Sequence, residues 1–107
     1  MRRGEVWWAC LPEPSGTRPV VLVSRDDAYC STKTHVIVVE VSRTIRSVPT
    51  EVLLSKRDGL HARCAANAGN VLTIRKDCLQ ERVGMLSPRR IRKLDCALRY
   101  AMQLDPI

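Results

Sequence analysis

Runs of β-branched and other apolar residues, separated by short polar stretches, predict a domain built mainly from strands. The clearest run is H-V-I-V-V-E-V at His35–Val41, whose nearly continuous apolar character is typical of a central strand. Alternate side chains along a strand share a face, so Glu40 and Ser42 should be neighbours on the same face.

The stretch Arg3–Ser24 predicts two strands joined by a loop. The loop, Pro12–Arg18, is rich in proline, serine and glycine, which favour turns. Arg18 stands where this loop becomes the second strand, and Pro19 disfavours helical backbone at the residue before it. An extended arginine at the mouth of a strand is a candidate contact for an anion.

Further strands are predicted at Thr50–Leu54, Cys64–Ile74 and Arg82–Leu86. The second of them is interrupted by N-A-G-N, which predicts a bulge or kink. The polar segments Arg25–Thr34 and Ser55–Arg63 are predicted loops, and Asp77 is predicted to cap a short helical turn that runs through Gln80.

The carboxy-terminal pattern predicts an amphipathic helix over Ser87–Leu104. Ser87 is a favourable N-cap, and Pro88 suits the first helical position. The basic residues fall outside an apolar stripe with spacings of three and four, which should pack on the sheet; the stripe consists of Ile91, Leu94, Leu98 and Ala101. The whole chain, residues 1–107, is therefore predicted to be a single, mainly β domain with a carboxy-terminal α-helix.

Composition adds a preference for anionic partners. The 107 residues include 18 Lys and Arg against 11 Asp and Glu, a formal net charge of +7, which favours nucleic acid or an acidic protein segment. The amino terminus lacks the pattern of a signal peptide, and no apolar run approaches a membrane span. Five cysteines without a C-x-x-C pair argue against a zinc site or a disulfide framework, so a cytoplasmic protein with reduced thiols is expected.

Aromatic and histidine side chains offer a few further candidates. Trp7 and Trp8 are adjacent, so on a strand they point to opposite faces; one should be in the core, and the other is either packed as well or half exposed and able to stack on a base. His61 lies in a predicted loop and is a candidate proton acceptor. No nucleotide-binding loop, metal motif or nucleophile elbow is present, so no cofactor or metal is expected.

Six segments together resemble a known family. In chain order they read R-G-E-V-W-W, L-P-E-P-S-G-T-R-P-V-V-L-V-S, V-I-V-V-E-V-S-R, P-T-E-V, N-V-L-T-I and L-Q-E-R-V-G-M-L-S-P-R-R-I. They resemble the MazF/PemK (Kid) toxins. The resemblance implies an SH3-like β-barrel of the CcdB/PemK type, a homodimer, and metal-independent, sequence-selective cleavage of single-stranded RNA. It also implies a cognate MazE-like antitoxin whose acidic tail occupies the RNA groove.

The resemblance also implies site residues. The arginine of R-P-V is Arg18, and the hydroxyl residue that ends the central strand is Ser42; these are the expected catalytic pair. RNA-binding positions are expected in the first loop, after the central strand and in the N-x-x-N segment: Ser15, Gly16, Thr17, Arg43, Arg46, Asn67 and Asn70. The sequence departs from the family pattern at Cys10, Cys30, Glu40 and Gly69.

Physical reasoning assigns roles to the expected pair. If the 2′-hydroxyl of the RNA is the nucleophile, the protein must move protons and stabilise charge on phosphorus. Arg18 suits the second task, because a guanidinium is always charged and offers two parallel donors to phosphate oxygens. Ser42 can hydrogen-bond the phosphate or relay a proton. The base that takes the proton is either Glu40 or His61. Glu40 could instead form a salt bridge to an arginine such as Arg18 or Arg43. If His61 is the base, the activity should change near pH ~6.5.

Two functions from other classes stay open at this point. One is a toxin without enzymatic activity that acts on a protein target, as the similarly folded CcdB group does. The other is a catalytically silent homologue that binds RNA. Cleavage of RNA without a divalent metal distinguishes an endoribonuclease from both, and strongly salt-dependent binding without cleavage supports the second.

Overall fold

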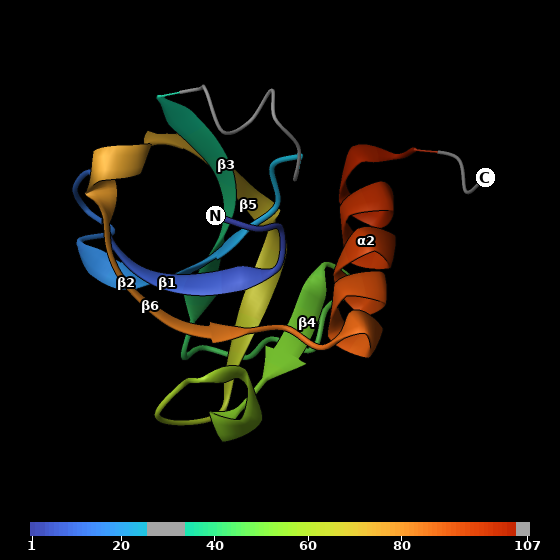
Figure 1. Ribbon diagram of the computed structural model, residues 1–107. Coiled ribbons are helices and arrows are strands. Elements are labelled where there is room, and N and C mark those ends of the chain that lie inside the picture. The colour runs from blue at the N-terminus through green and yellow to red at the C-terminus, as the bar shows by residue number, and fades with distance from the viewer. Residues whose placement is uncertain (26–33, 105–107) are drawn as a thin grey trace.

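A six-stranded antiparallel sheet curls on itself, and one helix stands against it (Figure 1). The computed structural model describes residues 1–25 and 34–104. This half-barrel with a carboxy-terminal helix confirms the predicted fold class. Two short 3-10 turns complete the elements, which are β1 Glu5–Cys10, β2 Thr17–Leu22, β3 His35–Ser42, β4 Glu51–Leu54, η1 Lys56–Asp58, β5 Cys64–Arg75, η2 Lys76–Cys78, β6 Leu79–Met85 and α2 Pro88–Met102.

The order of the strands brings the beginning of β2 beside the end of β3. The sheet runs β4-β5-β3-β2-β1-β6, so β3 is central, as its apolar run predicts. In the antiparallel pairing of β2 with β3, Val20 lies opposite Glu40. Arg18, near the start of β2, is therefore close to Ser42, the last residue of β3.

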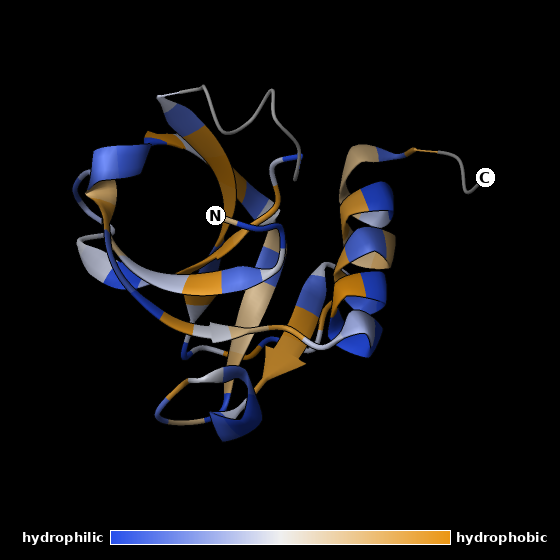
Figure 2. Ribbon diagram, in the orientation of Figure 1, coloured by the Kyte–Doolittle hydropathy of each residue, from blue (hydrophilic) through white to orange (hydrophobic). Residues whose placement is uncertain are grey.

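Alternation along the central strands builds two hydrophobic cores, one on each face of the sheet. Val20 and Val38 belong to the smaller core, whereas their chain neighbours Val21 and Val39 belong to the larger one. The larger core also takes in side chains of α2, and Figure 2 shows the apolar side of that helix turned toward the sheet. Burial on both faces explains why these strands read as continuous apolar runs.

The predicted bulge is present in β5. Val39 of β3 faces Val71, but Val41, two residues further on, faces Ala66. The residues between Ala66 and Val71 are the N-A-G-N segment, and these four residues stand opposite the single β3 residue Glu40. The bulge thus divides the pairing of β5 with β3 into two parts, and β4 pairs with the part of β5 before the bulge, from Cys64 to Asn67.

The helix α2 begins as predicted. The Ser87 hydroxyl accepts a hydrogen bond from the Arg90 backbone N–H, and Pro88 occupies the first position. The apolar stripe differs at one end, because Ala97 is buried while Ala101 is exposed. The helix ends at Met102, and Gln103 adopts the left-handed conformation that terminates it.

Three local predictions need correction. Asp77 does not cap a turn: the turn is Lys76–Cys78, its N-cap is Arg75, and the Asp77 carboxylate accepts hydrogen bonds from the Arg75 side chain instead. Strand β6 begins at Leu79, earlier than predicted, because it pairs with β1 from there. The predicted loop Ser55–Arg63 contains the turn η1. The predicted loop Arg25–Thr34 lies mostly outside the described residues, as does Cys30.

The cysteines of the described residues are all free thiols; Cys10 and Cys96 are exposed, Cys64 is buried, and Cys78 is intermediate. None of the helices within residues 1–25 and 34–104 combines the length and the apolar character needed to cross a bilayer.

Candidate active site

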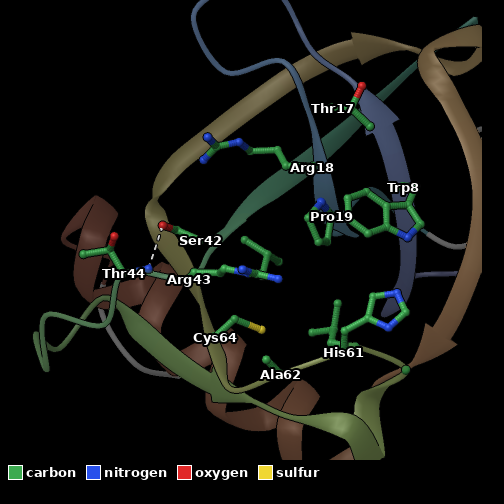
Figure 3. A pocket seen from close by; sticks show the side chains of 13 residues that line it. Trp8, Thr17, Arg18, Pro19, Ser42, Arg43, Thr44, His61, Ala62 and Cys64 are labelled. Atoms are coloured by element: carbon green, nitrogen blue, oxygen red, sulfur yellow. Dashed lines mark hydrogen bonds between the residues drawn. The ribbon is translucent and has the colours of Figure 1, made fainter.

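A cavity of about 410 Å³ opens where the start of β2, the end of β3 and the loop between η1 and β5 meet. It brings together five of the predicted site residues, and Figure 3 shows them around the opening with Trp8 and Cys64. None of the side chains that line it, among the residues described, is acidic. The five predicted residues are Thr17, Arg18, Ser42, Arg43 and His61.

Arg18 is held by two contacts. Its Nε donates to the Ser15 carbonyl at 3.0 Å, and its Nη1 lies 2.9 Å from Glu40 Oε1. These contacts fix the guanidinium plane, and no bond to a described residue occupies Nη2. The side chain is 36% exposed, so an anion can reach the remaining donor from the cavity. A guanidinium held in this way can present its Nη2 group to a phosphate oxygen without first changing its orientation.

Glu40 forms the salt bridge that the sequence left as an alternative to a catalytic role. Its side chain is only 12% exposed and contacts the Arg18 guanidinium. Glu40 is not among the residues that line the cavity. The Glu40 carboxylate therefore holds the Arg18 guanidinium from outside the cavity.

Ser42 presents a hydroxyl that donates to none of the residues the structure describes. The Ser42 Oγ accepts a hydrogen bond from the Thr44 backbone N–H at 3.1 Å, and Figure 3 marks this bond at the edge of the cavity. Because the oxygen accepts this bond, the hydroxyl hydrogen can be directed at an oxygen of a bound group. Arg43, the next residue, extends into the middle of the cavity and adds a second cation.

Trp8 and His61 form an aromatic wall on the other side. Their ring centroids lie 6.5 Å apart, with planes inclined by 36°. Trp8 comes from β1, next to Pro19 of β2, and His61 comes from the loop that follows η1. Figure 3 shows this pair across the cavity from Ser42, with Arg43 between them.

Cys64 lines the cavity without the character of a nucleophile. Burial raises the pKa of its thiol, the nearby Asp58 carboxylate raises it further, and Arg43 opposes this only in part. The thiol is therefore protonated at neutral pH, and a protonated thiol is a poor nucleophile.

The other predicted RNA-binding residues lie outside the cavity lining. Ser15 and Gly16 use backbone carbonyls within the first loop, where Ser15 holds Arg18 and Gly16 accepts from Leu11. Arg46 donates its backbone N–H to Glu51. The Asn67 side chain accepts from the Gly69 backbone inside the bulge, and Asn70 is exposed on β5.

Two further residues of the cavity are Trp8, one of the two tryptophans that the sequence offered for base stacking, and Thr44, which the sequence did not indicate. A signal for Trp8 was present: two adjacent tryptophans on a strand must face opposite sides, and only one of them can join a given core. Thr44 follows the strand and carried no comparable signal. Within the part of the chain described, no group of three or more His, Cys, Asp or Glu side chains could hold a metal ion.

Comparisons with known proteins agree with this geometry. The protein of Mycobacterium tuberculosis (strain ATCC 25618 / H37Rv) named "Probable endoribonuclease MazF5" is 37% identical over 101 residues, which cover 94% of this chain and 91% of that protein. The solved structure "Mycobacterium tuberculosis toxin MazF-mt6" matches with a TM-score of 0.87 at 26% identity, covering 95% of this chain and 99% of that one.

A second solved structure, "Endoribonuclease in complex with its cognate antitoxin from Mycobacterial species", matches with a TM-score of 0.84 at 29% identity and covers 100% of this chain and 99% of that one. The family model described as "PemK-like, MazF-like toxin of type II toxin-antitoxin system" matches residues 2–102. The chain therefore belongs to the PemK-like, MazF-like toxins of type II toxin–antitoxin systems.

Proposed function

We propose that this single-domain protein is the toxin of a type II toxin–antitoxin system and an endoribonuclease that cleaves single-stranded RNA, which would stop translation and growth. The observation that carries the proposal is the meeting of Arg18 and Ser42 at one cavity that contains two arginines and an aromatic wall. The names of the relatives, which are endoribonucleases, support the same activity.

The proposed reaction uses the 2′-hydroxyl of the RNA as the nucleophile. The 2′-oxygen forms a bond to phosphorus, and the bond from phosphorus to the 5′-oxygen breaks. The 2′-hydroxyl loses its proton to a base, and the departing 5′-oxygen gains one. The products are a 2′,3′-cyclic phosphate and a 5′-hydroxyl end.

Arg18 and Ser42 act on the phosphate in this scheme. Arg18 stabilises the charge that develops on the phosphate oxygens, because its plane is already fixed and no reorientation is needed during the reaction. Ser42 donates its free hydroxyl hydrogen to a phosphate oxygen. Glu40 serves to hold Arg18.

RNA binding is proposed along the surface that leads into this cavity. Thr17 and Arg43 contact the nucleotides at the reacting bond, and the first loop positions Arg18 through Ser15 and Gly16. Arg46, Asn67 and Asn70 lie outside the cavity and are proposed to contact more distant nucleotides.

Two protein partners belong to the proposal. An antitoxin with an acidic tail is supported by the complex in the solved neighbour and by the net charge of +7. A homodimer is supported by a second groove, between β4 and α2, in which Leu53 and Tyr100 are 43% and 63% exposed. A cytoplasmic site of action is proposed because RNA in translation is the target.

The test is cleavage of a long, mixed-sequence single-stranded RNA by the purified protein in EDTA, with the cut sites mapped. Arg18→Ala and Ser42→Ala should abolish discrete cuts. Arg99→Ala serves as the matched control, since Arg99 is exposed on α2, and it should cut as the wild type does. Circular dichroism establishes that each variant is folded.

Intact RNA after incubation with the folded wild type would overturn the proposal. Salt-dependent binding without cutting would then identify a silent RNA-binding homologue. If the protein neither binds nor cuts RNA, its target would be a protein.

A further inference from the structure

The two adjacent tryptophans have different surroundings. The Trp7 indole donates to Glu5 Oε1 at 3.0 Å, and its ring packs against the smaller hydrophobic core. Trp8 points the other way and lines the cavity, where its ring remains partly exposed. Trp7 therefore has a structural role, whereas Trp8 offers an aromatic face to whatever enters the cavity.

His61 faces Trp8 from a loop that is fixed in place. The turn before it has a capping box in which Ser55 and Asp58 exchange side-chain and backbone hydrogen bonds. Gly59 has a φ of +93°, and a Cβ added there would lie 2.0 Å from the Val83 carbonyl oxygen. The loop backbone thus lies directly against β6 at Gly59, two residues before His61.

The aromatic wall formed by Trp8 and His61 has the geometry and the location of a binding site for a flat ring. Its two rings are inclined by 36° rather than stacked on each other, so each leaves part of a face toward the cavity. The wall stands across the cavity from Ser42 (Figure 3). A phosphate held at Arg18 and Ser42 would therefore direct an adjoining nucleobase toward Trp8 and His61.

We propose that Trp8 and His61 form a nucleobase subsite, in which one unpaired base adjoining the reacting phosphate stacks on Trp8 and contacts His61. This inference rests on the proposed function, since it deepens the recognition of RNA at the same site. Base stacking on aromatic side chains tolerates any base, whereas the ring nitrogens of His61 can accept from or donate to a base edge. The subsite therefore contributes affinity through Trp8 and selectivity through His61.

The direct test uses binding, without cleavage. The chain has two tryptophans, so a Trp7→Phe variant reports on Trp8 alone. A set of 2′-deoxy oligonucleotides, each with one abasic position, is titrated against it while fluorescence is followed. The intact oligonucleotide should quench Trp8. One abasic position should remove the quenching and weaken binding about tenfold or more, while the others should have little effect.

His61 supplies an independent variant, because it is exposed in a loop and its replacement should not affect folding. His61→Ala should weaken binding of the intact oligonucleotide at least about fivefold and should not weaken binding of the oligonucleotide that is abasic at the sensitive position. His61→Phe keeps a ring, so it should retain the affinity but lose base preference there. Arg63→Ala, an exposed change in the same loop, is the control and should leave binding of both oligonucleotides within about twofold.

The outcomes separate the two proposals. Equal binding and equal quenching across all abasic positions would overturn the subsite, even if the protein cuts RNA. Failure to cut RNA would overturn the proposed activity, while the abasic series would still decide the subsite. If His61→Ala weakened the binding of intact and abasic oligonucleotides equally, that result would also contradict the nucleobase subsite.

Discussion

Two regions of the molecule carry concentrated positive charge, but they hold it differently. In the cavity, Arg18 is fixed by a carbonyl and a carboxylate beside the Ser42 hydroxyl. On the outer face of α2, Arg92 and Arg99 are exposed to solvent. Exposed cations attract a polyanion from a distance, and salt screens that attraction. Only an oriented donor can favour a transition state over a ground state, so the net charge alone does not locate the site.

A third kind of arginine lies on the same helix. Arg90 donates to the Leu53 carbonyl, and its Nε lies 3.6 Å from the nearly buried Asp58 carboxylate. This arginine ties α2 to β4 and to the turn η1. In the proposed function, arginine thus serves three purposes in this molecule, namely catalysis, attraction of the polyanion and structure, and the surroundings of each arginine determine which.

Of the substitutions that compare the cavity with the outer face of α2, Arg18→Ala should have the largest effect on cleavage. Removing an oriented donor to the developing charge should lower kcat by about 10²–10³. Arg99→Ala should change kcat/KM by no more than about threefold, and high salt should reduce that difference. Steady-state cleavage of a defined RNA at two salt concentrations measures both; equal losses in the two variants would show that orientation is irrelevant.

Arg90→Ala should act on stability. It leaves the Asp58 carboxylate, whose side chain is 4% exposed, without its cation, and should lower the free energy of unfolding by about 1–3 kcal/mol. Arg99→Ala, at an exposed position of α2, should change it by less than about 0.5 kcal/mol. Urea denaturation measures both, and similar midpoints for the two variants would contradict the structural role of Arg90.

Glu40→Gln distinguishes holding Arg18 from catalysis. Glutamine keeps an acceptor for the Arg18 guanidinium but removes a negative charge beside it. RNA should then bind about threefold to tenfold more tightly, with kcat within about threefold of the wild type. A drop in kcat of about 10² or more, with loss of the acidic limb of the pH–rate profile, would identify Glu40 as the base instead.

The smallest expected effect concerns Glu5, whose Oε2 lies 3.4 Å from Nε of Arg82. Burial works to raise the pKa of Glu5, but the Trp7 indole bond, backbone hydrogen bonding, the amino terminus and Arg82 together hold that pKa below its ordinary value. A lowered pKa stabilises the fold above the unfolded-state pKa, near 4.5, and this contribution is lost as the pH falls through the folded-state value.

Glu5→Gln should therefore cost up to about 1 kcal/mol near pH 7 and less as the pH falls below about 4. Thermal unfolding across that range measures the difference. Glu81→Gln, an exposed change on β6, should show no such dependence. A cost for Glu5→Gln that is constant with pH would contradict the assignment.

Local signals in the sequence were sufficient for most of the fold. The Ser87–Pro88 start of α2 and the central position of β3 follow from capping chemistry and β-branched composition. The prediction that Asp77 caps a helical turn was wrong, because a short acidic side chain can accept hydrogen bonds from a neighbouring arginine as readily as from the end of a helix. The start of β6 was missed because its pairing with β1 joins distant parts of the chain.

The part of the site that lies at the ends of strands could be predicted from the sequence. Arg18 and Ser42 meet because β2 and β3 are antiparallel. The aromatic wall was not predictable, because it joins Trp8 to a loop more than fifty residues away in the chain. The partner of Glu40 was one of several alternatives in the sequence, and only the register of the strands selects Arg18.

In the proposed reaction, this cavity cleaves RNA with the 2′-hydroxyl of the RNA itself. The most direct measurement replaces the nucleotide 5′ of a mapped cut by its 2′-deoxy form and repeats the incubation in EDTA. This cut should disappear while others persist, and the products of the unsubstituted RNA should carry a 2′,3′-cyclic phosphate and a 5′-hydroxyl. Continued cutting at the substituted position would contradict it.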